Sequence, residues 1–92
     1  MLSRKKANYN KTGIEGLPND KPVLYRIKTG TGMDNYVGTA KRGRVQDRLK
    51  EHLAEIPGIT VEIQQFDSIA EAREKETNVI NARKPKYNRQ GK

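Results

Sequence analysis

The chain has very little apolar material for its charge, and this limits what it can fold into. Leu, Ile, Val and Phe make up 18 of its 92 residues, close to the ~20% below which highly charged chains stay disordered. We therefore expect one small domain, because a second core would need more apolar residues than the sequence holds. The absence of cysteine excludes a disulfide framework and a zinc–thiolate site, and it fits a cytoplasmic protein.

The charge balance is strongly basic. Nineteen Lys and Arg residues against eleven Asp and Glu residues give a net charge of +8. Such a balance favours a polyanionic partner, of which nucleic acid is the commonest, although solubility alone is the simpler alternative. The apolar runs are far shorter than the ~20 residues needed to cross a bilayer, and the basic start of the chain lacks the apolar stretch of a secretory signal. We expect a soluble protein with no membrane partner.

The first half of the chain contains an expected arm and an expected hairpin. Glycines and a proline interrupt the few apolar residues of 1–20, which predicts a flexible basic arm. Residues 23–27 alternate between β-forming and other side chains, residues 29–32 form a Thr-Gly-Thr-Gly turn, and residues 35–38 read as a second short strand.

The second half predicts two helices and one strand. A stripe of apolar residues at helical spacing indicates a helix over 44–56, which Pro57 and Gly58 end. Alternation predicts a strand over 59–66, and a capping-box pattern begins a helix at Ser68 that runs to about Arg83. The fold class is therefore α+β, a small three-stranded antiparallel sheet flanked by helices in the order β-β-α-β-α. We expect this domain over 21–88, followed by a basic tail over 89–92.

Polar residues stand where the helical patterns call for apolar ones. Glu76 lies within the apolar stripe of the last helix, where a carboxylate costs free energy unless a cation, a donor or a metal receives it. Helical spacing alone slightly favours an ion pair with Arg73 over a metal-binding role. In the first helix Arg48 and His52 lie four residues apart at the edge of the stripe, and each has a structural alternative, as a snorkelling arginine and as a core histidine.

These three residue types converge with two strand tyrosines, Tyr25 and Tyr36, on the sheet-facing sides of a very small domain. A carboxylate, an arginine, a histidine and phenol groups together are what phosphodiester hydrolysis requires: a metal ligand, a charge stabiliser and proton-transfer groups. The Thr-Gly-Thr-Gly turn has no Walker-type ending, and neither serine is suited to acyl transfer.

In this order and spacing, these residues resemble the GIY-YIG nuclease superfamily, and within it the nuclease domains of bacterial excision-repair enzymes and phage homing endonucleases. The family name describes two tripeptides on a hairpin, and ten residues separate the corresponding tyrosines here. The matching segments are Val23-Leu24-Tyr25, Tyr36-Val37-Gly38, the helix over 45–53, the helix over 71–76 and the closing segment 84–88. Two departures are the valine at 23, where the family has glycine, and a stretch from Tyr36 to Arg48 that is about two residues longer than usual.

The resemblance implies metal-dependent hydrolysis of DNA phosphodiester bonds, with DNA repair as one setting. Glu76 would bind one Mg²⁺ or Mn²⁺, and Arg48 would hold the scissile phosphate. Tyr25, with Tyr36 or His52, would help to deprotonate the attacking water. The resemblance further gives Asn88 the role of orienting the helix end or of forming a hydrogen bond in the site.

Basic residues outside this set are expected to bind the DNA backbone. They are Lys41, Arg42 and Arg44 in the loop before the first helix, and Lys84 and Lys86 near the end of the chain. The same residues suit the main alternative, a non-catalytic nucleic-acid-binding module on the same fold, and a protein-interaction domain is a third reading. A separate protein that confers specificity is a further expected partner.

Overall fold

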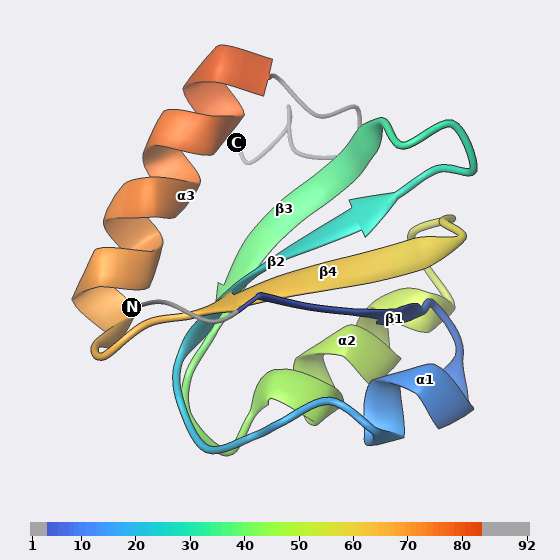
Figure 1. Cartoon of the computed structure of the whole chain (residues 1–92). Helices are drawn as coiled ribbons and strands as arrows, with labels where there is room; N and C mark the ends of the chain where they lie inside the picture. Colours follow the sequence, from blue (N-terminus) through green and yellow to red (C-terminus); the bar gives the residue numbers. More distant parts are fainter. Residues whose placement is uncertain (1–3, 84–92) are drawn as a thin grey trace.

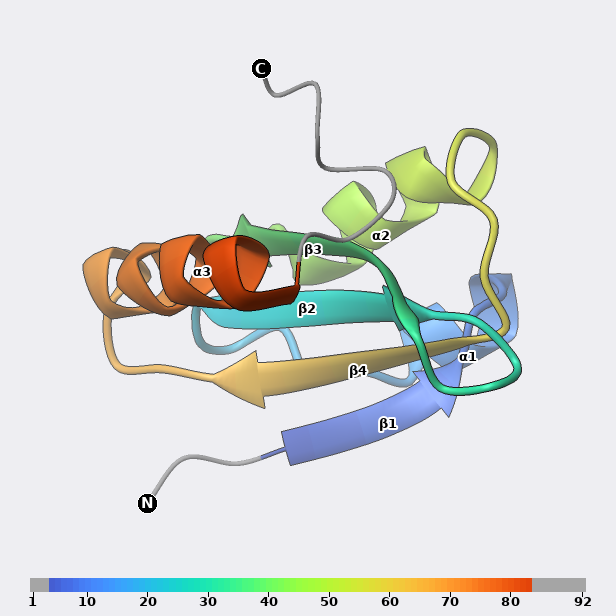
Figure 2. The same cartoon turned by 90° about the horizontal axis from the view of Figure 1, so that it is seen from above.

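The computed structural model describes residues 4–83. They form a four-stranded antiparallel sheet and three helices (Figure 1). In chain order the elements are β1 (Arg4–Asn8), α1 (Lys11–Glu15), β2 (Val23–Lys28), β3 (Asp34–Ala40), α2 (Val45–Leu53), β4 (Thr60–Gln65) and α3 (Ile69–Arg83). The strand order across the sheet is β1-β4-β2-β3, and Figure 2 shows β1 at one edge and β3 at the other. The α+β class is confirmed, whereas the sheet has one strand more than expected.

Helices cover both faces of the sheet, so the core is divided in two. Helices α1 and α2 lie on one face, and α3 lies on the other, where it packs on β3 and β2 (Figures 1 and 2). The alternation of β2 explains this division, because Val23, Tyr25 and Ile27 enter the cluster beneath α1 and α2, while Leu24 enters the cluster beneath α3. None of the helices over 4–83 is long and apolar enough to cross a membrane.

The N-terminal segment corrects the expectation of a flexible arm over residues 1–20. Strand β1 pairs antiparallel with β4 from Arg4 to Asn8, and Tyr9, Ile14 and Leu17 are buried in the core. This strand has no apolar alternation in the sequence, because its residues are nearly all exposed and polar. Backbone hydrogen bonds to the open edge of β4 hold β1 in place. Charged side chains are usual on such an edge strand.

The expected hairpin and the start of α3 are confirmed, and α2 is shorter than expected. Tyr25 pairs with Gly38 across β2 and β3, and the Glu71 N–H donates to Ser68 Oγ at 3.2 Å, as the capping pattern predicts. Helix α2 ends at Leu53 instead of reaching residue 56. Residues 54–56 form a turn there because Pro57 disfavours helical backbone in the residue before it.

Candidate active site

Tyr25 is the centre of the site. Its side chain is wholly buried beneath α2, and its ring lies across Gly38 of the neighbouring strand. A Cβ atom at position 38 would lie 2.6 Å from Tyr25 Oη and 2.7 Å from Cζ, so only glycine leaves room for the ring. The Tyr25 hydroxyl lies 2.8 Å from Nε2 of His52 on α2. The pairing of β2 with β3 therefore places the Tyr25 ring over Gly38, with its hydroxyl at His52.

Tyr36 and His52 complete an aromatic cluster around Tyr25. The ring centroids of Tyr36 and His52 are 4.8 Å apart, and those of Tyr25 and Tyr36 are 6.1 Å apart in a stacked arrangement. Burial lowers the pKa of His52 below its ordinary value of 6.5, and the nearby Arg48 guanidinium lowers this pKa further. The imidazole is therefore neutral at pH 7 and has one nitrogen that can accept a proton.

Arg48 places a positive charge beside the Tyr25 hydroxyl. Arg48 lies one helical turn before His52 on α2, and its guanidinium lies close enough to the Tyr25 hydroxyl to act on its pKa. Burial, and next the neighbouring Tyr36, raise the pKa of Tyr25 above its ordinary value of 10.0, while the charge of Arg48 lowers it. The Tyr25 O–H can donate to His52 Nε2, because the neighbouring guanidinium offers it no acceptor. In the tautomer that carries its proton on Nδ1, His52 accepts this bond.

Glu76 approaches the site from α3. The carboxyl is half-buried, and burial raises its pKa, whereas Arg73, a hydrogen bond from the Thr39 hydroxyl and the charge of Arg48 lower this pKa. Of the two arginines, Arg73 lowers this pKa more, as its spacing of three residues on the same helix allows. Within residues 4–83, however, none of the ion pairs joins Glu76 to Arg73. The carboxylate is only partly compensated and is available to a cation.

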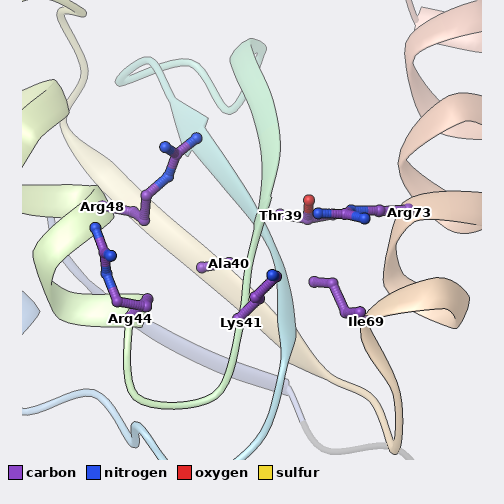
Figure 3. Close-up of a pocket in the computed structure, with 7 residues that line it drawn as sticks. All are labelled: Thr39, Ala40, Lys41, Arg44, Arg48, Ile69 and Arg73. Atoms are coloured by element: carbon purple, nitrogen blue, oxygen red, sulfur yellow. The ribbon is translucent and has the colours of Figure 1, made fainter.

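A cavity of about 290 Å³ lies between α2 and α3 and crosses β3 (Figure 3). Four of the side chains that line it are cationic and none is acidic. The lining residues are Thr39, Ala40, Lys41, Arg44, Arg48, Ile69 and Arg73. A concave surface with this charge suits the phosphate backbone of a nucleic acid.

The comparisons with known proteins bear on this arrangement. No protein-family model and no curated protein matches the chain. A solved structure does: the crystal structure of the GIY-YIG N-terminal endonuclease domain of UvrC from Thermotoga maritima, bound to its catalytic divalent cation, magnesium. The TM-score is 0.68 at 28% sequence identity, and the match covers 85% of this chain and 93% of that chain. The chain resembles a GIY-YIG endonuclease domain. The resemblance expected from the motifs is therefore confirmed.

Most of the expected GIY-YIG site residues come together in the structure. Tyr25, Tyr36 and His52 are joined by the ring contacts and the hydrogen bond given above, Arg48 lies beside the Tyr25 hydroxyl, and Glu76 faces them from α3 through Thr39 and Arg48. Of the expected DNA-binding residues, Lys41 and Arg44 line the cavity, whereas Arg42 is exposed and is not part of the lining. The remaining expected residues, Lys84, Lys86 and Asn88, lie outside the described residues.

The donor set at Glu76 fits a magnesium ion. Within the described part of the chain, no group of three or more His, Cys, Asp or Glu side chains is arranged to hold a metal. Mg²⁺ does not need such a group, because it keeps several waters and is often bound through one or two carboxylates and substrate phosphates. A desolvated carboxylate that forms no ion pair within residues 4–83, near a cationic cavity, matches that habit.

Three residues of the site were not among those expected from the sequence. Gly38 makes room for Tyr25, Thr39 lies beside Glu76 and lowers its pKa, and Arg73 lines the α3 side of the cavity together with Ile69. Gly38 ends the second tripeptide of the GIY-YIG pattern, so its position signalled a role. Arg73 was weighed only as the partner of Glu76, because no sequence pattern indicates which surface cations face a common cavity.

Proposed function

We propose that the chain is a metal-dependent endonuclease that hydrolyses DNA phosphodiester bonds, with a single Mg²⁺ or Mn²⁺ held by Glu76. The observation that carries the proposal is the position of the Tyr25 hydroxyl beside a neutral imidazole and beside Arg48, a cation that also lines the cavity. A module that only binds nucleic acid has no use for a half-buried carboxylate beside its phosphate site, since the two negative charges repel each other.

In the proposed reaction, the site's own residues move one proton and hold one phosphate. Tyr25 passes its proton to His52 Nε2 and accepts a proton from the attacking water, whose oxygen forms the new bond to phosphorus while the bond to the leaving oxygen breaks. Arg48 binds the phosphate and stabilises the negative charge that grows on its oxygens. Glu76 would hold the metal ion, which when bound supplies Lewis-acid stabilisation of the departing oxygen.

Glu76→Ala is the test that separates catalysis from structure. We expect the wild-type protein to nick supercoiled DNA with Mg²⁺ or Mn²⁺ and not with EDTA. Glu76→Ala should abolish nicking and preserve DNA binding, and its melting temperature should be unchanged or higher, because the desolvated carboxylate is gone and alanine is the better helix former by a few tenths of a kcal/mol. Glu74→Ala is the matched control, since this exposed glutamate on α3 lines a different surface.

Two outcomes would overturn the proposal. If Glu76→Ala melts well below wild type and still cuts DNA, Glu76 is a structural partner of Arg73. If the folded wild-type protein cuts no supercoiled, branched or single-stranded DNA with either metal, the alternative function holds. That alternative is a nucleic-acid-binding module, which the four cations of the cavity favour.

A further inference from the structure

The cavity between α2 and α3 holds more positive charge than one scissile phosphate requires. Its four cations come from three places in the chain: the loop between β3 and α2, helix α2 and helix α3. Arg44 already forms two ion pairs: its Nε lies 3.8 Å from Asp47 Oδ2, and its Nη2 lies 3.8 Å from Glu51 Oε2. Within residues 4–83, Lys41, Arg48 and Arg73 form no ion pair. Like charges around one cavity repel each other, and a bound anion relieves that repulsion.

The three cations that have no ion pair within residues 4–83 divide between two parts of the cavity. Arg48 lies beside the buried Tyr25 hydroxyl, at the catalytic end of the cavity. Figure 3 shows Arg73 reaching from α3 toward Thr39 on β3, and Lys41 follows the end of that strand on the same cavity. Arg48 and Arg73 therefore stand on the two helices that border the cavity, so a strand that passes between them can present a separate phosphate to each.

We propose that Arg73, with Lys41, forms a second phosphate subsite that holds the backbone phosphate next to the scissile one. The volume of about 290 Å³ is near the lower limit of ~300 Å³ for small-ligand sites, which suits a phosphate with its sugar. The substrate class is a nucleic-acid strand that carries at least two consecutive phosphates. This inference rests on the proposed function only for the identity of the scissile phosphate.

The subsite is tested with two small ligands in EDTA, where no cleavage takes place. Thymidine 3′,5′-bisphosphate should bind the wild-type protein about tenfold more tightly than thymidine 5′-monophosphate, measured by calorimetry, because the extra phosphate gains charge-assisted hydrogen bonds. Arg73→Gln should remove this difference and Arg73→Lys should retain part of it. Lys75→Gln is the matched control: Lys75 is a cation of the same helix that lines another surface, and its loss should leave the difference intact.

A duplex DNA measurement gives an independent readout. For a 20-base-pair duplex in EDTA, the slope of log K against log salt should become about one unit less steep in Arg73→Gln and should not change in Lys75→Gln. An equal affinity for the two thymidine ligands, or an Arg73→Gln protein with wild-type ligand preference and salt slope, would refute the subsite. Neither assay depends on cleavage, so an inactive protein that shows the Arg73 effects refutes the nuclease proposal and supports the subsite.

Discussion

The contact between Tyr25 and Gly38 makes Gly38→Ala the most informative substitution in this protein. The new methyl group would lie 2.6 Å from Tyr25 Oη and 2.7 Å from Cζ, whereas carbon contacts in proteins are ordinarily ~3.5–4.0 Å. The ring must therefore move by about 1 Å. Tyr25 is wholly buried, so this movement also disturbs the side chains packed around it.

Two opposing effects set the change in the free energy of unfolding that Gly38→Ala causes. Forcing an extra methyl group into a packed core costs about 1–3 kcal/mol, and replacing glycine in a strand returns roughly 0.5–1 kcal/mol. We expect Gly38→Ala to lower the free energy of unfolding by about 1–2 kcal/mol. A shift of about 1 Å also carries the hydroxyl beyond hydrogen-bonding range of His52 Nε2, now at 2.8 Å. Misplacement of that size can reduce an enzymatic rate ~100-fold.

Urea unfolding and the nicking assay measure the two effects on the same preparation. Gly30→Ala is the matched control, because a Cβ atom there would meet Ile59 Cγ1 at an ordinary 3.7 Å. In a Tyr25→Leu background, Gly38→Ala should cost nothing in stability, since the ring that it strikes is absent. If Gly38→Ala unfolds at the wild-type urea concentration and nicks DNA at the wild-type rate, the placement of Tyr25 across Gly38 is wrong.

Three further predictions concern the support of the site. Asn19→Ala should lower the free energy of unfolding in urea by about 1 kcal/mol, because Asn19 Oδ1 accepts the Val45 N–H at 2.8 Å at the start of α2. Asn19→Asp should keep most of this stability, since aspartate can accept the same hydrogen bond. Equal losses in the two variants would show that this hydrogen bond does not stabilise the protein. Since burial lowers the pKa of His52, the unfolded chain takes up the proton first, so stability should fall as pH drops from about 6.5 through the folded pKa. His52→Gln should flatten that part of the stability–pH curve, and an unchanged curve would show that His52 does not cause it. Tyr9→Phe should cost about 1–3 kcal/mol, because Tyr9 Oη donates to the buried Ile56 carbonyl at 2.9 Å; wild-type stability would show that the segment before α1 is not part of the core.

The sequence alone determined those features that depend on near neighbours in the chain. Alternation predicted the β2–β3 hairpin and the strand at β4, and Ser68 marked the start of α3, because each pattern depends on residues a few positions apart. The same local logic drew attention to Glu76, a carboxylate in an apolar stripe. The motif order supplied the remaining candidate residues, and its resemblance agrees with the fold comparison.

Only the tertiary structure decided the features that depend on distant segments. Strand β1 has a polar sequence and no intrinsic signal, and it is ordered because β4 offers it an unpaired edge. Arg73 and Lys41 are far apart in the chain, and the packing of α3 on β3 puts them in one cavity. Local patterns report which face of an element is buried. Which charges meet across the space between two elements depends on how those elements pack, and the sequence carries no periodic signal for that.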